Sequence, residues 1–296
     1  MARKRTGVCA LCGGIERENL FEKDGYPIGR CRSCGLVQVG AELNAGELEA
    51  IYGEDYFKDE IFDDYMAERA ARLESGARLA DALARIVPGG RLLDVGCAAG
   101  FFLKAASRHY DVTGVELSLF AADYARTELG LRVLTGDVTE VALDGERFDV
   151  VTMWNTIEHM ADPLGAVRRV AGLVPPSSVL ALSTGDASGP LARRDLSRWN
   201  LMSPPHHLFF FTPSTLDLLL AKAGFRLRRI VYDGVVATAG PLASNRGRRV
   251  ASLAGLGNVM TVYAVRTASG TQTPSRPRRL AARYLPLGVT LRRGRR

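Results

Sequence analysis

One stretch of ten residues, Arg91–Gly100, constrains the fold of this 296-residue chain more than any other. It reads RLLDVGCAAG, an apolar run that ends in an acidic residue and then changes to small residues. From Phe101 onward, apolar residues recur at helical spacing. A strand, a glycine-containing loop and a helix in this order form the first βα unit of a nucleotide-binding α/β domain. Because dinucleotide-binding domains share this pattern, the loop alone does not specify the ligand.

A second acidic residue, Glu116, ends the next apolar segment, 22 residues after Asp94. A carboxylate at a strand end can bind the hydroxyls of a ribose, and glycines let the backbone approach a ligand closely. The two strand ends are therefore expected to share a nucleotide site.

Strands and helices alternate through the rest of the central region. Helices are expected to begin at Pro163 and after Thr212, each behind an N-cap residue. The expected strands are 91–95, 112–116, 132–135, 148–155, 179–183, 227–232 and 260–265. This alternation predicts an α/β fold with a Rossmann-like, doubly wound, mostly parallel seven-stranded sheet, which binds ligands at the carboxyl ends of its strands.

Four cysteines near the start of the chain form two C-x-x-C pairs, Cys9 with Cys12 and Cys31 with Cys34. A glycine follows each pair, where a positive φ lets backbone N–H groups turn toward a thiolate. Four thiolates at this spacing predict a closed, structural Zn²⁺ site in a small ribbon. Disulfides and unlinked thiols are the alternatives; the lack of a secretion signal disfavours the first and the pairing of the motifs the second.

Four motifs, in this order, resemble those of class I S-adenosylmethionine-dependent methyltransferases: Asp94–Gly100, Glu116, Gly136–Val138 and Phe148–Val151. The four-cysteine ribbon and the later segment 199–210 are similar to a bacterial subgroup that often acts on small molecules, sugars or cell-surface glycans. The family's loop has glycine where this chain has Ala98, which is small enough for the loop to be kept.

The resemblance assigns the cofactor contacts of the first two motifs. The loop, with Gly96, Cys97 and Gly100, would pass under the methionine part of S-adenosylmethionine, and Asp94 would orient the loop or the amino group. Glu116 would bind the ribose hydroxyls.

The resemblance also assigns the remaining contacts. Leu117 would lie beside the adenine, Asp137 would accept from the adenine amino group, and Val138 would offer its backbone N–H. Trp154 and Asn155 would face the reacting methyl group. A turn residue is the alternative for Asp137, and a core aromatic is the alternative for Trp154.

Catalysis needs mainly alignment, because the methyl group of a sulfonium is already activated. An oxygen or nitrogen acceptor also needs its proton removed, and histidine is the usual base near neutral pH. His207 is the first candidate and His206 the second, because they lie in a segment expected to cover the mouth of the site. A histidine that only holds this segment by hydrogen bonds is the alternative.

Glu158 and His159 resemble a pair in quinone-pathway O-methyltransferases, where acidic residues and such a histidine bind a divalent metal. The residue three positions earlier is Asn155 rather than an acid. We therefore expect Glu158 and His159 to form hydrogen bonds at a helix start instead.

The positive charge is concentrated near the end of the chain. Twelve arginines and no acidic residue follow residue 233, and the rest of the chain has 27 basic and 32 acidic residues. Such a tail could bind nucleic acid or an anionic membrane surface, although a solvated tail is favoured. We expect a zinc ribbon over 1–40, a helical connector or lid over 41–75, a methyltransferase domain over 76–267 and a basic, disordered tail over 268–296.

The expected activity is transfer of a methyl group from S-adenosylmethionine to a small metabolite, sugar or glycan. An RNA base methyltransferase is one alternative, but the ribbon has few basic residues beyond Arg30 and Arg32. A non-catalytic adaptor is the other, and the intact Glu116 and Asp137 disfavour it. A cytoplasmic location is expected, because no apolar run approaches the roughly 18–20 residues of a membrane span and no secretory signal is recognisable.

Overall fold

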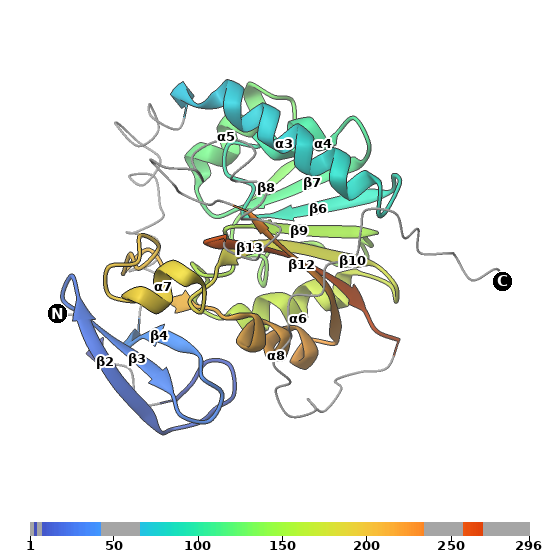
Figure 1. Ribbon diagram of the computed structural model, residues 1–296. Coiled ribbons are helices and arrows are strands. Elements are labelled where there is room, and N and C mark those ends of the chain that lie inside the picture. Colours follow the sequence, from blue (N-terminus) through green and yellow to red (C-terminus); the bar gives the residue numbers. More distant parts are fainter. Residues whose placement is uncertain (1–2, 5–7, 43–65, 234–256, 269–296) are drawn as a thin grey trace.

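A seven-stranded sheet forms the centre of the larger part of the protein, shown by a computed structural model that describes residues 3–4, 8–42, 66–233 and 257–268 (Figure 1). In spatial order the strands are β12 (Phe225–Asp233), β13 (Val259–Arg266), β10 (Val179–Gly185), β9 (Val150–Trp154), β6 (Arg91–Val95), β7 (Asp111–Glu116) and β8 (Val133–Thr135). The strands from β10 to β8 are parallel, and β13 is antiparallel to both of its neighbours. The predicted Rossmann-like sheet is therefore confirmed.

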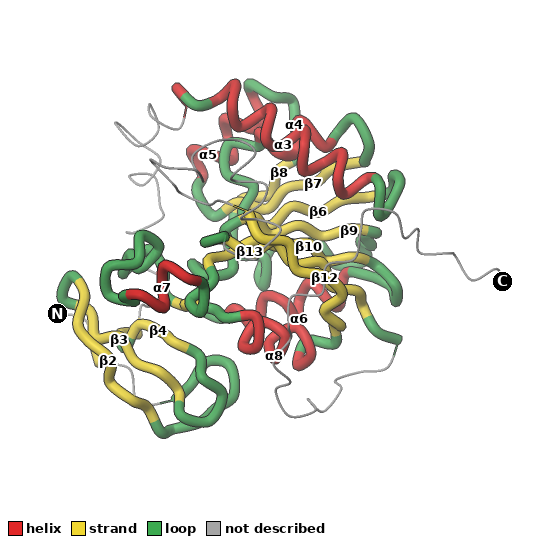
Figure 2. Tube along the Cα trace, viewed as in Figure 1, coloured by secondary structure: helices red, strands yellow, loops and turns green. Residues whose placement is uncertain are grey.

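Helices cover both faces of this sheet (Figures 1 and 2). On one face lie α3 (Arg69–Ala84), α4 (Phe101–Ala106) and α5 (Leu119–Thr127); on the other lie α6 (Pro163–Leu173) and α8 (Pro213–Lys222). A separate apolar cluster fills each interface. Asp162 caps α6 through the N–H of Gly165 at 2.9 Å, and Thr212 caps α8, so both predicted helix starts are confirmed.

The region before the sheet is only partly described. One continuous helix, α3, crosses the expected boundary at residues 75 and 76. The connector over 43–65, the Ala- and Gly-rich segment over 234–256 and the tail from 269 lie outside the described residues. None of the helices that the structure describes combines the length and apolar character needed to cross a bilayer.

The ribbon is a small antiparallel sheet to which the larger domain contributes a strand. Its own strands are β2 (Arg17–Lys23), β3 (Tyr26–Cys31) and β4 (Val37–Val39), with a separate two-stranded pair of β1 (Arg3–Lys4) and β5 (Ala41–Glu42). The fourth strand, β11 (Phe209–Phe210), pairs with β4. The N–H of Val39 also donates to the carbonyl of Leu208 at 2.9 Å. Backbone pairing thus joins the ribbon to the segment that carries His206 and His207, an arrangement that the sequence did not predict.

Candidate active site

Glu116 holds the glycine loop against the end of β7. Its carboxylate accepts the backbone N–H of Ala98 at 2.8 Å and that of Ser118 at 2.9 Å. Burial raises the pKa of Glu116, and the backbone N–H groups of Ser118, Ala98 and Leu117 partly oppose that shift. A carboxylate has about four acceptor positions, so these donors do not use all of them and a ligand hydroxyl can still be accepted.

The loop between β6 and α4 has a backbone that requires small residues. Gly96 and Gly100 adopt φ values of +73° and +80°. A Cβ at Gly96 would lie 2.4 Å from Thr156, so a side chain there would force Thr156 to move. Ala98 also has a positive φ, +48°, a conformation that costs an L-residue roughly 1–2 kcal/mol. The Cys97 side chain is buried, which raises its pKa and leaves only its backbone to face a ligand.

Asp94 lies buried at the centre of the sheet, at the topological switch between β6 and β9. Its carboxyl accepts the hydroxyl of Thr152 at 2.6 Å. Burial raises the pKa of Asp94 to about 8, and the nearby Glu116 adds to the shift. The switch point is where open α/β sheets bind ligands. Asp94 is therefore at the expected place, with a carboxyl that is largely protonated at neutral pH and hydrogen-bonded to β9.

The neighbouring strand ends present the residues assigned to the adenine. Leu117 is 43% exposed, unusual for a leucine this close to the sheet. Asp137 is exposed, and its Oδ1 accepts the N–H and the hydroxyl of Thr139 at 2.7 and 2.6 Å, which is the bonding of a turn residue. The side chain of Val138 is buried. Because the N–H of Gly136 donates to the carbonyl of Glu116, the ends of β7 and β8 lie together.

Trp154 and Asn155 end β9 on the same edge of the sheet. Trp154 packs edge-on against Phe102 of α4, with ring centroids 5.3 Å apart. Its indole nitrogen is buried and has no hydrogen-bond partner in the described part of the chain. Asn155, at φ +48°, accepts the hydroxyl of Ser183 at 3.1 Å and donates its N–H to the carbonyl of the same residue. Asn155 therefore ties β9 to β10.

Two histidines lie edge to face beside this strand end, with ring centroids 4.7 Å apart. His207 Nδ1 lies 2.6 Å from the carbonyl of Leu201, and His159 Nδ1 lies 2.7 Å from the carbonyl of His206. A carbonyl can only accept, so each Nδ1 carries the proton, which leaves Nε2 of His207 as the basic nitrogen of that ring. Burial lowers the pKa of His207, and it lowers that of His159 to about 4. Both rings are therefore neutral at pH 7.

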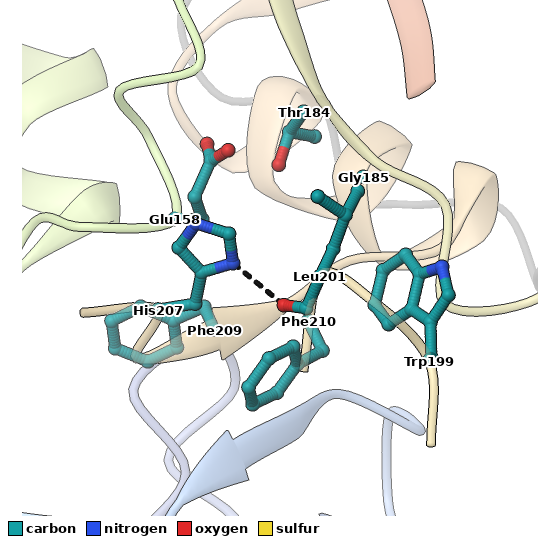
Figure 3. Close-up of a pocket in the computed structure, with 8 residues that line it drawn as sticks. All are labelled: Glu158, Thr184, Gly185, Trp199, Leu201, His207, Phe209 and Phe210. Atoms are coloured by element: carbon teal, nitrogen blue, oxygen red, sulfur yellow. Dashed lines mark hydrogen bonds between the residues drawn. The ribbon is translucent and has the colours of Figure 1, made fainter. Parts of the chain in front are cut away.

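Glu158 faces His207 across a small cavity (Figure 3). The cavity measures about 10 Å³, room for about one water. Glu158 is 4% exposed, and its Oε2 has no hydrogen-bond partner among the described residues. Burial raises the pKa of this carboxyl. An unpartnered buried oxygen is costly, and the cavity beside it has room for the water that would satisfy it.

The expected helix-start role for Glu158 is wrong. Helix α6 begins at Pro163 behind the Asp162 cap, and Glu158 precedes it in a separate turn. The carbonyl of Glu158 instead accepts the N–H of Leu208 at 2.8 Å, which binds this turn to the segment before β11. Three possible metal ligands lie within 4.8 Å of one another, one atom each from Glu158, His159 and His207. These residues could therefore also hold a divalent cation.

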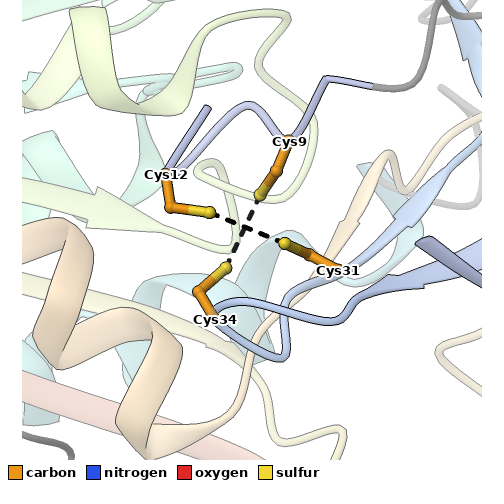
Figure 4. A group of neighbouring side chains, drawn as sticks. All are labelled: Cys9, Cys12, Cys31 and Cys34. Atoms are coloured by element: carbon orange, nitrogen blue, oxygen red, sulfur yellow. Dashed lines mark hydrogen bonds between the residues drawn. The ribbon is translucent and has the colours of Figure 1, made fainter. Parts of the chain in front are cut away.

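The four cysteine sulfurs meet at one point in the ribbon (Figure 4). The Sγ atoms of Cys9 and Cys34 are 3.6 Å apart, and those of Cys12 and Cys31 are 3.5 Å apart. A tetrahedral Zn²⁺ with bonds of about 2.3 Å separates its sulfurs by about 3.8 Å, whereas a disulfide needs about 2.05 Å. The donor set therefore fits zinc.

The backbone around the cysteines also favours thiolates. Gly13 and Gly35 adopt φ values of +76° and +81°, as the sequence predicted. The N–H of Gly14 points to the sulfur of Cys12 at 3.4 Å. Hydrogen bonds from Cys34 and from backbone N–H groups lower the pKa of Cys9 to about 5, whereas the shared hydrogen bond with Cys9 raises the pKa of Cys34 and burial raises that of Cys12.

A Rossmann-like sheet with a glycine loop and an acid at the next strand end is shared by dinucleotide-binding domains and class I methyltransferases. A family model described as a methyltransferase domain matches residues 64–230, more than half of the chain. The chain therefore belongs to this methyltransferase family.

Curated relatives are similar over part of their length. Ubiquinone biosynthesis O-methyltransferase from Coxiella burnetii is 32% identical over 102 residues, which cover 32% of this chain and 44% of the relative. The enzyme of the same name from Azorhizobium caulinodans is 30% identical over 164 residues, which cover 50% and 65%. The chain thus matches less than two thirds of the length of either relative.

Solved structures share the fold. A methyltransferase from Thermotoga maritima, described as a possible histamine N-methyltransferase, aligns with a TM-score of 0.53 at 22% identity, over 70% of this chain and 96% of that one. A methyltransferase from Archaeoglobus fulgidus aligns with a TM-score of 0.52 at 20% identity, over 70% and 100%. At these identities the likeness establishes the fold alone.

Proposed function

We propose that the enzyme transfers the methyl group of S-adenosylmethionine to a hydroxyl of a small-molecule acceptor, and that the four cysteines hold a structural zinc. The observation that carries this proposal is the hydrogen bond from the backbone N–H of Ala98 to the carboxylate of Glu116. It places a carboxylate with spare acceptor positions beside a loop whose backbone can lie against a ligand. The names of the relatives, O-methyltransferases of a small-molecule pathway, support the acceptor class.

His207 is the proposed base. Its Nδ1–H is fixed by Leu201, so Nε2 is available to accept the proton of the acceptor hydroxyl. The new oxygen–carbon bond forms as the carbon–sulfur bond breaks, with the electron pair remaining on sulfur. The lowered pKa keeps His207 in its basic form at neutral pH. His206 contributes through its backbone carbonyl, which orients His159.

A second role for the same residues is favoured by one specific observation. Histidines that bind metals commonly donate their other ring N–H to a carbonyl, as His159 and His207 do here. Two imidazoles and the open oxygen of Glu158 would then hold a divalent cation that polarises the acceptor hydroxyl.

Methyl-labelled S-adenosylmethionine tests the activity directly. We expect a labelled small molecule when the donor and a metabolite extract are incubated with the wild type, and far less with Glu116→Gln. Label in RNA would overturn the acceptor class. No label in any fraction, together with no donor binding by calorimetry, would overturn the proposed activity.

The amount of labelled product then distinguishes a general-base role of His207 from a role in binding a cation. His207→Gln should reduce labelling by a factor of about 10²–10⁴, the usual contribution of a general base. A chelator that leaves the ribbon zinc bound should have no effect on the wild type if His207 acts as a base. Loss of labelling, restored by Mg²⁺ or Mn²⁺, would assign the cation role instead.

A further inference from the structure

A groove beside the ribbon is formed jointly by the ribbon and α7 (Pro190–Arg194), which lie side by side (Figure 1). Its volume is about 450 Å³, within the range of about 300–1,000 Å³ typical of small-molecule sites. The ribbon contributes Arg30, Gly35 and Val37; the larger domain contributes the end of α7 and the residues around it. Neither part forms the groove alone.

The charge of this groove is positive. Arg193 and Arg194 line it, are exposed, and have no ion-pair partner in the described parts of the chain. Arg30 faces them from β3 and, among the described residues, is paired only with Glu18, at 3.4 Å on the surface. Such an exposed pair is weak, so Arg30 can turn to a ligand at little cost.

One acid, Asp195, lies among these arginines. Its carboxylate accepts the hydroxyl of Ser197 at 2.6 Å and lies 3.8 Å from Arg198, which is outside the groove. These bonds hold Asp195 against its own turn. Three guanidinium groups against one engaged carboxylate leave a net positive groove.

Guanidinium groups recognise phosphate through paired N–H donors, which suits arginine better than lysine. The groove also has an apolar part, formed by Val37, Ala192 and Leu196. A ligand that fits is therefore a small molecule with a phosphate or diphosphate at one end and an apolar or ring portion at the other.

We propose that this groove binds the phosphate-bearing end of the acceptor. The assignment of the ligand as acceptor rests on the proposed function; the anion site itself does not. The segment that follows β10 connects the two places, because it carries Arg193 and Arg194 in the groove and then Trp199, Leu201 and His207 around the Glu158 cavity. A phosphate held at α7 would fix one end of the acceptor on the same segment that holds the base.

A nucleic-acid backbone would offer the same phosphate chemistry. The geometry favours the small molecule, because the site is a concave groove with two arginines that no described residue pairs, rather than a basic stripe with stacking aromatics. The ribbon side of the groove adds only Arg30.

Calorimetry with inorganic pyrophosphate as the probe tests the site in the full chain with zinc bound. The wild type is expected to bind it, and Arg193→Gln combined with Arg194→Gln should weaken binding at least tenfold. Arg228→Gln is the control, because this arginine is exposed and does not line the groove. It should bind pyrophosphate as the wild type does.

Three outcomes would overturn the proposal: no binding by the wild type, equal binding by the double variant, or equal weakening in the control. A short RNA oligonucleotide is tested in parallel. If RNA binds much more tightly than pyrophosphate and loses affinity in the double variant, the site belongs to nucleic acid instead. Titration of S-adenosylmethionine keeps the two proposals apart, because the double variant should bind the donor normally. Failure of donor binding in the wild type would reject the methyl transfer and not the anion site.

Discussion

Gln38 of the ribbon lies directly opposite Phe209 of the larger domain in one antiparallel sheet, and both side chains are buried. Gln38 also contacts the turn between Cys9 and Cys12, because its Oε1 accepts the N–H of Ala10 at 3.3 Å. Since Phe209 follows His207 by two residues, a short series of hydrogen bonds connects the proposed zinc site with the proposed base.

Removal of the metal should therefore loosen the segment around His207. A ribbon of this size depends on its metal for folding, and β4 is the strand that holds β11. After chelation we expect amide hydrogen exchange over residues 206–211 to accelerate at least tenfold, while β6 and β7 change little. Hydrogen-exchange mass spectrometry measures this.

The cysteine variants provide the control for that experiment. Cys34→Ser should reproduce the effect of chelation, and Cys97→Ala should not, because Cys97 lies in the glycine loop. Unchanged protection of residues 206–211 in metal-free protein would show that the pairing of β4 with β11 does not depend on the metal.

Replacement of Glu116 should weaken cofactor binding. Glu116→Gln replaces the carboxylate, which would accept hydrogen bonds from the ribose hydroxyls, by a neutral amide. A hydrogen bond to a charged group contributes about 1.5–3 kcal/mol. We expect the Kd for S-adenosylmethionine to rise by about tenfold to hundredfold, measured by calorimetry. Glu128→Gln, an exposed change at the end of α5, should have no effect. Equal affinity of both variants would reject the ribose contact.

Asp94 should give the protein a stability that declines as pH rises. Its folded pKa of about 8 lies above the ordinary value of 3.8, so between these values the folded state keeps a proton that the unfolded state has lost. The contribution is complete below about pH 3.8 and is lost toward pH 8, at up to about 1.4 kcal/mol per pH unit.

Asp94→Asn isolates this effect, because the amide oxygen can still accept from Thr152 and does not titrate. Urea unfolding at several pH values between 5 and 8 should show the wild type losing stability relative to the variant as pH rises. Parallel curves for the two proteins would mean that Asp94 is ionised in the folded state.

The parts of this structure that sequence could predict depend on local patterns. The two C-x-x-C pairs and the loop from Asp94 to Gly100 contain their signal within a few residues, because close backbone turns need glycine and metal sites need fixed ligand spacing. The alternating strands and helices could be recognised from periodicity in the same way.

The parts that sequence missed depend on contacts between distant segments. Strand β11 has two residues, too few for any periodicity, and its partner β4 lies far away in the sequence. The only hint was the apolar run of Phe209, Phe210 and Phe211, which is unusual for a loop. Glu158 was misplaced for a similar reason, since its burial follows from the packing of Leu208 and Phe209 against its turn.

Ala98 provides a last test of the loop, because it stands where the family's loop has glycine. Its φ of +48° costs an alanine roughly 1–2 kcal/mol, whereas glycine adopts this conformation freely and loses about 0.5–1 kcal/mol through the greater entropy of its unfolded chain. Ala98→Gly should therefore raise the free energy of unfolding by about 0.5–1 kcal/mol.

The adjacent Ala99 is the matched control, because it is fully buried and does not have a positive φ. Ala99→Gly should lower the free energy of unfolding by about 1 kcal/mol through added chain entropy and lost packing. Urea unfolding of the three proteins measures both changes. If the two variants were destabilised alike, the left-handed conformation at Ala98 would carry no strain, and the loop would tolerate alanine for another reason.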